Sequence, residues 1–333
     1  MPLFMDEECV TGLVTMDDAL EALEELFREQ GRGGVVNVPR VRAPVKGGIL
    51  RITAGVLSYR GYYGIKISSN AVSSKHVGRL FCLYREDGAD LCAIMQVYGM
   101  GALRTGAASG VATKYLSRED ASVLGVIGAG PQARTQAQAI CRVRAIRQIK
   151  VYSPTPANRE RFAREIMTLT GATASAVESA EAATRNSDIV VTATNSKTPV
   201  LLGRWLAPGT HVNAIGANYE HRRELDLDAV AAAACVVADD REQVQYESTD
   251  LAEAVKAGVL DWDRVRNLSE IVSGRAGGRS SPREVTLFKS LGVAMEDVAL
   301  AARAYERAVE RKAGVPLPDL DRMAEASRRA RGE

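Results

Sequence analysis

A glycine-rich turn is the feature of this sequence that most clearly indicates chemistry. The apolar run 123–127 leads into Gly128-Ala-Gly130-Pro-Gln-Ala133, and residues 132–143 then have helical spacing. Gly128 permits a tight turn, Gly130 lets the backbone approach a pyrophosphate, and Ala133 allows the helix to pack closely on the strand. Because a helix N-terminus attracts anions, this pattern predicts a dinucleotide-binding turn. The alternative is a tight strand-to-helix turn that binds nothing.

The end of the next strand indicates which dinucleotide would fit. In NAD-binding turns of this type, an Asp or Glu about 20 residues further on contacts the ribose hydroxyls. Here the expected strand 149–153 ends in Ser153, and Thr155, Asn158 and Arg159 follow. Hydroxyl and guanidinium groups without a nearby carboxylate suit a 2′-phosphate. The pattern therefore favours NADP(H), with NAD(H) as the second choice; the alternative is an ordinary solvated helix face.

Two regions with different periodicity must position these residues. After Asp120, apolar strand runs alternate with helical segments, which predicts an α/β fold with a doubly wound parallel sheet. Between residues 35 and 97, short β-rich runs broken by Gly-Gly and Asp-Gly pairs predict an antiparallel sheet. Helical spacing predicts further helices over 15–28, 101–116 and 295–312.

Composition limits the partners. The 333 residues include 43 Lys and Arg against 41 Asp and Glu, so no basic surplus favours nucleic acid or an anionic membrane surface. No apolar run approaches the roughly 18 residues of a membrane-spanning helix, and residues 1–10 do not resemble a signal peptide. Five scattered cysteines predict reduced thiols and a cytoplasmic location. His76, His211 and His221 lack metal-ligand spacing, so no metal is expected.

A series of short segments extends in order over most of the chain. The segments are Val38–Arg42, Gly64–Lys66, Leu103–Ser109, Gly128–Ala133, Thr192–Asn195, Asn213–Ala217, Arg223–Asp226, Gly278-Arg279 and Phe288–Asp297. Together they resemble the ornithine cyclodeaminase/μ-crystallin family. The combination is specific for the family and much less specific for the substrate.

The resemblance implies a protein of two domains. A Rossmann dinucleotide-binding domain is expected over residues 116–304. Residues 1–115 and 305–333 are expected to form an α+β domain that binds the substrate and makes a homodimer through its sheet. The β-rich region before residue 101 and the alternation after residue 120 agree with this division.

The resemblance also implies roles for individual residues. Arg40 and Arg104 match the family's carboxylate-binding arginines, with Arg42 as the alternative to Arg40, and Lys66 matches its catalytic lysine. A guanidinium offers two parallel donors to a carboxylate, and desolvation near cations lowers a lysine pKa toward neutrality. Taken singly, each arginine is more simply a surface group, and Lys66 the polar face of an edge strand. The residues expected around the cofactor are Thr105, Gly128, Gly130, Pro131, Gln132, Ala133, Ser153, Thr155, Asn158, Arg159, Thr192, Ala193, Thr194, Asn195 and Gly292.

One departure from the family pattern narrows the reaction. In the family's cyclodeaminases an Asp follows the Gly-Gly or Gly-Ala pair, whereas here Gly216-Ala217 is followed by Asn218, which cannot take a proton. The ketimine-reductase branch also lacks that Asp. We therefore expect NAD(P)H-dependent reduction of a small cyclic imino acid, Δ1-pyrroline-2-carboxylate or Δ1-piperideine-2-carboxylate, to the L-amino acid. The alternatives are an ornithine cyclodeaminase, an open-chain amino-acid dehydrogenase and a dinucleotide-dependent binding protein.

Overall fold

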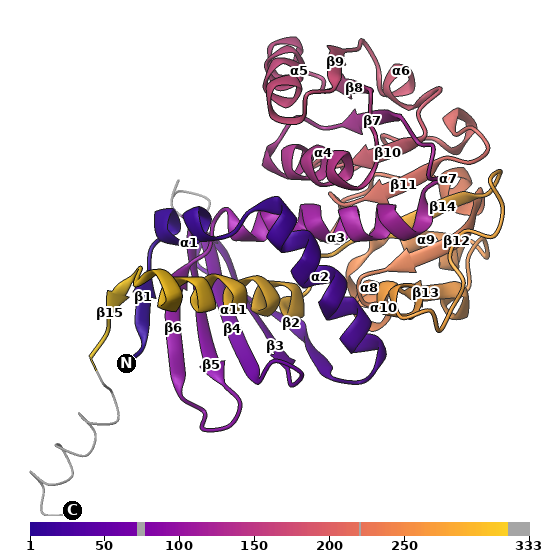
Figure 1. The fold of residues 1–333 in the computed structure, drawn as a ribbon. Coiled ribbons are helices and arrows are strands. Elements are labelled where there is room, and N and C mark those ends of the chain that lie inside the picture. Colours follow the sequence, from indigo (N-terminus) through magenta and orange to yellow (C-terminus); the bar gives the residue numbers. More distant parts are fainter. Residues whose placement is uncertain (72–76, 220, 319–333) are drawn as a thin grey trace, which may run out of the picture.

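Two β-sheets lie side by side and share one long helix (Figure 1). The structure is a computed structural model that describes residues 1–71, 77–219 and 221–318. One sheet has seven strands in the order β15-β1-β6-β5-β4-β3-β2, and the other has eight in the order β13-β12-β14-β11-β10-β7-β8-β9. Helix α3 (Met100–Leu116) contacts α2 (Met16–Gly31) and α11 (Ala294–Arg311), which pack on the first sheet; this sheet and its helices are called the first layer. Helix α3 also contacts α4 (Pro131–Val143), β11 (His211–Ala214) and β14 (Val285–Lys289), which belong to the half of the molecule built on the second sheet. It therefore joins the two halves.

The first sheet is antiparallel over its main five strands, as predicted. These strands are β2 (Val35–Val45), β3 (Gly48–Leu57), β4 (Tyr62–Ala71), β5 (Val77–Arg85) and β6 (Leu91–Gln96). Two short strands were not predicted. Strand β1 (Leu3–Met5) pairs in parallel with β6, and β15 (Val315–Pro316) pairs antiparallel to β1.

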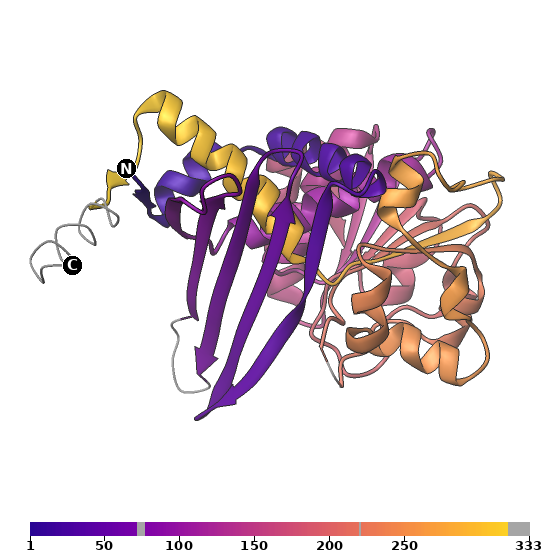
Figure 2. The same cartoon turned by 90° about the horizontal axis from the view of Figure 1, so that it is seen from below.

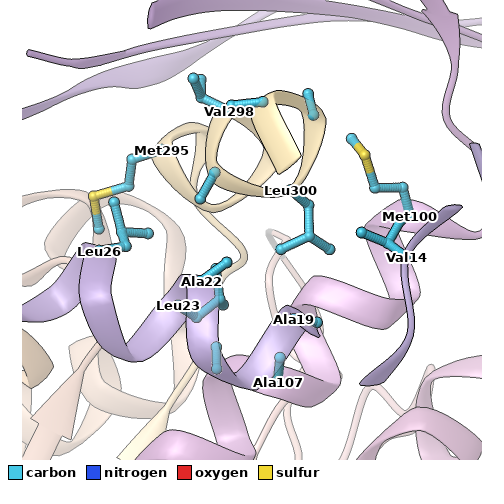
Figure 3. Close-up of a cluster of buried hydrophobic side chains, with 14 of the residues drawn as sticks. Val14, Ala19, Ala22, Leu23, Leu26, Met100, Ala107, Met295, Val298 and Leu300 are labelled. Carbon is cyan, nitrogen blue, oxygen red and sulfur yellow. The ribbon is translucent and has the colours of Figure 1, made fainter. Parts of the chain in front are cut away.

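Helices cover one face of this sheet (Figure 2). They are α1 (Glu7–Leu13), α2 (Met16–Gly31), α3 and α11 (Ala294–Arg311). A capping box between Thr15 and Asp18 starts α2. Leu23 and Leu26 of α2 pack against Met295 and Leu300 of α11 in a fully buried core (Figure 3). Burial of each such side chain contributes roughly 1.5–3 kcal/mol, which holds the C-terminal helix onto the N-terminal layer.

The second sheet is parallel throughout its described strand pairs. Its strands are β7 (Val123–Ile127), β8 (Gln148–Tyr152), β9 (Thr173–Ala176), β10 (Ile189–Thr192), β11 (His211–Ala214), β12 (Ala233–Ala238), β13 (Val265–Asn267) and β14 (Val285–Lys289). The chain runs from β7 outward through β8 to β9 and then returns to place β10 on the other side of β7. The predicted doubly wound fold is therefore confirmed, and its switch point, where ligands usually bind, lies between β7 and β10.

Short connections and helices surround this sheet. They are α4 (Pro131–Val143), α5 (Pro156–Thr170), α6 (Ala180–Thr184), η1 (Gly203–Trp205), α7 (Leu227–Ala231), α8 (Arg241–Glu247), α9 (Thr249–Lys256), η2 (Trp262–Arg264) and α10 (Leu268–Val272). Within the described ranges, no helix is both long and apolar enough to cross a membrane.

The family resemblance places a domain boundary between residues 304 and 305. It falls inside α11, and residues on both sides of it, such as Leu300 and Ala308, are buried in the core of the first layer. The C-terminal contribution to this layer therefore begins at Ala294. Residues 319–333, which were assigned to the same domain, lie outside the described part of the chain.

Candidate active site

A cavity of about 550 Å³ lies where the inner face of the first sheet meets the carboxyl ends of β10 and β11. Predicted site residues from both halves of the chain line it together. They are Arg40, Arg42, Lys66, Arg104, Thr105, Gln132, Ala193, Thr194, Asn195 and Asn218. The structure thus brings the proposed carboxylate, proton-transfer and nucleotide residues to one place.

Lys66 and Arg104 are bound to the same carboxylate. Lys66 Nζ forms an ion pair with Asp297 Oδ2, and Arg104 Nε donates to Asp297 Oδ1 at 3.0 Å. Asp297 lies in the first turn of α11, where the helix dipole also favours a negative charge. Burial works against its ionisation, but Arg104 and Lys66 keep the pKa of Asp297 below its usual value. Sequence reasoning assigned no role to Asp297, although it lies in the C-terminal motif.

The environment of Lys66 suits proton exchange near neutral pH. Burial lowers the pKa of Lys66 to about 8, with Arg104 and Arg40 adding to the effect and Asp297 opposing it. The side chain nevertheless lines the cavity and is 15% exposed. A buried lysine of this kind exchanges a proton with a bound nitrogen more readily than a solvated one.

Arg104 is held by several neighbours. Its Nη1 donates to Glu296 Oε2 at 3.1 Å and to Thr105 Oγ1 at 2.5 Å. Burial raises the pKa of Glu296 to about 8, despite the opposing charge of Arg104. Gly292 has φ +71°, and an added Cβ would overlap Arg104 Nη1. Gly292, which was predicted to contact the cofactor, therefore makes room for the guanidinium and is not among the residues that line the cavity.

Arg40 and Arg42 share a carboxylate that the sequence did not indicate. Arg40 Nη1 lies 2.8 Å from Glu247 Oε2, and Arg42 Nη1 lies 2.9 Å from Glu247 Oε1. Arg40 Nη2 also donates to the carbonyls of Leu291 and Gly292 at 3.2 and 2.5 Å. Both arginines line the cavity, so the structure leaves both as carboxylate-binding candidates. Glu247 ends α8, and nothing in its local sequence connects it to residues 200 positions away.

The predicted glycine turn fits a dinucleotide pyrophosphate. Gly128 has φ +122°, and an added Cβ would overlap the carbonyl of Ala193. Gly130 caps α4 without a side chain, and no atom lies within 4 Å of where its Cβ would be. Among the described atoms, Gln132 Oε1 is buried and has no partner. The open backbone at Gly130 and the N-terminus of α4 can accommodate the negative charge of a pyrophosphate. The unsatisfied Gln132 Oε1 can accept a hydrogen bond from a donor group of the same ligand.

A second buried carboxylate, Glu224, holds the loops that follow β10 and β11. It accepts hydrogen bonds from the backbone N–H groups of Thr194 and Gly216, both at 2.6 Å, and from the hydroxyls of Thr192 and Thr194 at 2.9 and 2.8 Å. The Thr192 side chain is therefore turned toward Glu224. Burial raises the pKa of Glu224, and the nearby ammonium of Lys289 opposes this shift. Glu224 lies in the Arg223–Asp226 segment that carries part of the family resemblance, but the sequence did not indicate that its carboxylate holds these two loops.

The residues expected near a 2′-phosphate lie at the end of β8, outside the cavity lining. Arg159 Nη1 donates to the carbonyl of Ser153 at 3.2 Å, and Arg159 Nη2 pairs with Glu178. Asn158 accepts from Arg161, and the side chain of Thr155 makes no cap to α5. Arg159 thus lies beside Ser153 at the end of β8, where the sequence predicts contact with a 2′-phosphate, but its guanidinium is already paired with the carboxylate of Glu178.

Among the residues that the structure describes, the remaining titratable groups are not clustered as metal ligands would be. His211 is buried, Nδ1 lies 2.9 Å from Thr286 Oγ1, and burial lowers its pKa to about 3. Residues 1–71, 77–219 and 221–318 contain no group of three or more His, Cys, Asp or Glu arranged to hold a metal ion. His76 lies outside the described residues.

A doubly wound sheet with a glycine turn at its switch point, facing a second sheet that carries a lysine and several arginines, is typical of nucleotide-dependent oxidoreductases. The chain matches the model of the ornithine cyclodeaminase/mu-crystallin family over residues 2–312. It belongs to this family, and it is an enzyme of the oxidoreductase class.

Three similar proteins illustrate the family. The alanine dehydrogenase of Archaeoglobus fulgidus is 36% identical over 94% of this chain and 97% of its own length. The structure of Thermococcus litoralis Δ1-pyrroline-2-carboxylate reductase with NADH and L-proline matches with a TM-score of 0.90 and 36% identity, over 95% of this chain and all of that one. The iminosuccinate reductase of Paracoccus denitrificans with NAD+ matches with a TM-score of 0.89 and 28% identity, over 94% and 98% of the two chains.

Proposed function

We propose that this protein reduces the C=N bond of a small 2-imino acid with NADPH or NADH, and that cyclic imino acids such as Δ1-pyrroline-2-carboxylate are substrates. The observation that carries the proposal is the convergence of Lys66 and Arg104 on Asp297 beside a nucleotide-type turn. Two of the similar proteins named above are reductases of imino acids, which supports the same reaction class.

The positions of the residues support the following roles. Arg104, with Arg40 or Arg42, would bind the substrate carboxylate through paired N–H donors. Lys66 would donate a hydrogen bond or a proton to the imine nitrogen, because it is the lysine that faces the cavity and has a lowered pKa. Asp297 would fix the Lys66 ammonium, and Glu224 would hold the loops that carry Thr194 and Gly216. When bound, a reduced nicotinamide supplies the hydride for the imine carbon, and the nitrogen keeps its proton.

A preference for NADPH is the finer part of the proposal. Ser153 at the end of β8 offers no carboxylate to repel a 2′-phosphate, and Arg159 lies beside it. Arg159 would have to exchange Glu178 for the phosphate, so we expect a moderate preference with NADH also accepted.

Two other reactions remain as second candidates. Reductive amination of an open-chain 2-oxo acid is favoured by the 36% identity with an alanine dehydrogenase. Cyclodeamination is less consistent with the site, because Asn218 occupies the position after Gly216-Ala217 and an amide cannot exchange a proton. Ammonia release from ornithine without net oxidation of added cofactor would identify that reaction.

The outer face of the first sheet supports a homodimer. Val41, Ile52, Ile67 and Leu80 are direct neighbours across four strands, and all four side chains are exposed. No described element covers this face (Figure 2). An apolar patch of this extent is typical of a protein–protein interface. We expect a dimer of this chain with a mass of twice 35.8 kDa in light scattering, and a cytoplasmic location in keeping with its free cysteines.

The decisive test is the oxidation of NADPH, followed by absorbance, with Δ1-pyrroline-2-carboxylate or Δ1-piperideine-2-carboxylate. NADH, and pyruvate with excess ammonia, are run beside it. Turnover of a cyclic imine in the absence of ammonia supports the proposal. Turnover of pyruvate with ammonia alone would instead identify an open-chain dehydrogenase, and no turnover with any imine would reject imine reduction.

A further inference from the structure

The cavity contains a second row of cationic side chains beyond Lys66. Across the strands of the first sheet, Arg42 is the direct partner of Arg51, Arg51 of Ser68, and Ser68 of Arg79. Direct partners share one face of a sheet, and these four residues line the cavity. We call these four residues the arginine row. Lys66 and its partner Thr53 form the neighbouring row, two residues along the strands.

Buried carboxyl groups contact the cations of the inner part of the cavity. Asp297 binds Lys66 and Arg104, Glu296 accepts a hydrogen bond from Arg104, and Glu247 binds Arg40 and Arg42. These carboxylates do not line the cavity, and no other Asp or Glu of the described residues lines it.

Arg79 and Arg222, at the outer part of the cavity, contact neutral groups. Arg79 donates to the carbonyl of Tyr98 at 3.5 Å and lies 5.7 Å from the centre of its ring. Arg222, which also lines the cavity, donates to Asn195 Oδ1 at 2.9 Å. Within residues 1–71, 77–219 and 221–318, neither guanidinium has an ion pair with a carboxylate.

Arg42 and Arg51 are directly opposite each other on β2 and β3. Like charges directly opposite each other on neighbouring strands destabilise a sheet. Burial lowers the pKa of Arg51, and the charges of Arg42, Arg79 and Arg222 lower it further. A carboxylate placed among these guanidinium groups would relieve the repulsion and accept charge-assisted hydrogen bonds.

We infer that the arginine row, with Arg222, binds a second carboxylate on the substrate side chain, so that the preferred substrate is a short dicarboxylic 2-imino acid. This inference rests on the proposed function and specifies its substrate class. Neighbouring rows are roughly 7 Å apart along the strands, and arginine side chains can extend over part of that distance. The carboxylates of a four- or five-carbon dicarboxylic acid can therefore reach Arg104 and the arginine row at the same time.

The test compares two four-carbon anions, succinate and butyrate, by calorimetric titration of the NADP+-saturated protein. Succinate is expected to bind at least tenfold more tightly than butyrate. Arg79→Gln should remove most of this difference and leave the affinity for butyrate within about twofold. Ser68→Asp, which places a negative charge in the same row, should weaken succinate binding more than butyrate binding. Arg85→Gln is the matched control, because Arg85 is exposed on the same strand and does not line the cavity.

Kinetics give an independent readout. With excess ammonia, kcat/KM for oxaloacetate should exceed that for pyruvate by at least tenfold, and Arg79→Gln should lower the ratio by a similar factor. Equal binding of the two anions, or equal weakening of both by Arg79→Gln, would overturn the inference. Efficient reduction of cyclic imines together with a preference for pyruvate would also overturn it, while leaving the proposed function intact. If no imine is reduced, the proposed function fails and the anion titration alone decides whether the row binds a dicarboxylate.

Discussion

Lys66 and Asp297 form an ion pair although 231 residues separate them in the sequence. Lys66 comes from the middle of β4, and Asp297 from the first turn of α11. The same carboxylate also accepts from Arg104 Nε at 3.0 Å, so the positions of the lysine and the arginine are linked. The return of α11 onto the first sheet is therefore part of the construction of the candidate active site.

Replacing Lys66 by Met should abolish turnover while leaving the nucleotide turn intact. Loss of a positioned proton-transfer group typically lowers the rate by roughly 10²–10⁴. We expect a decrease in kcat of that size with an unchanged dissociation constant for NADPH, measured by quenching of protein fluorescence. Lys46→Met, in the turn between β2 and β3, is the matched control. Retention of turnover in the Lys66 variant would remove this residue from the mechanism.

The pH profile should report the protonation of Lys66. Since burial lowers the pKa of Lys66 to about 8, the ammonium form is populated below pH 8 and is lost above it. If protonated Lys66 is required for reduction, kcat/KM should decrease as the pH rises through about 8. Asp297→Asn removes a charge that favours the ammonium form, so the decrease should move to lower pH. A decrease at the same pH in both proteins would show that another group titrates.

Glu224→Gln should weaken nucleotide binding through the loops that it holds. Its carboxylate accepts from two backbone N–H groups and two hydroxyls, and a neutral amide offers fewer acceptor sites. Leaving buried donors unsatisfied costs about 1–3 kcal/mol. We expect lower stability in urea unfolding and a roughly tenfold higher dissociation constant for NADPH, since 1.4 kcal/mol corresponds to a factor of ten. The exposed Asp228→Asn is the control, and equal effects of both variants would contradict this role.

Ser153→Asp should shift the cofactor preference toward NADH. A carboxylate at the end of the second strand accepts from the ribose hydroxyls of NAD and repels a 2′-phosphate. The ratio of kcat/KM for NADPH to that for NADH should decrease by at least tenfold. An unchanged ratio would mean that the end of β8 does not contact the adenosine ribose.

Much of the fold can be read from local patterns. Strand 123–127, the glycine turn and helix 132–143 agree with β7, the Gly128–Gly130 turn and α4 (Pro131–Val143), because periodicity and turn chemistry act over a few residues. The antiparallel region over residues 35–97 was predicted for the same reason. Motif resemblance also selected Lys66 and Arg104, which do line one cavity.

Local patterns did not identify the charged partners of the site. Glu247, Asp297 and Glu224 are each buried against residues that are distant in the chain, and a single carboxylate has no periodicity that would mark it. The packing of the whole of α11 on the first layer was not predicted, for a related reason. The helical pattern of α11 is uniform along its length, and only its packing on α2 and the first sheet assigns it to that layer.

By itself, the sequence determined the two kinds of sheet, the nucleotide-type turn and the identity of the residues available for chemistry. Only the tertiary structure decided which of those residues meet. Strand register places Arg42, Arg51, Ser68 and Arg79 in one row, and a shift of one residue would turn a strand's side chains to the opposite face. Register depends on burial of one whole face and on turn geometry, which are properties of the assembled sheet. The charge of the cavity, and with it the substrate that we infer, is therefore decided by tertiary structure.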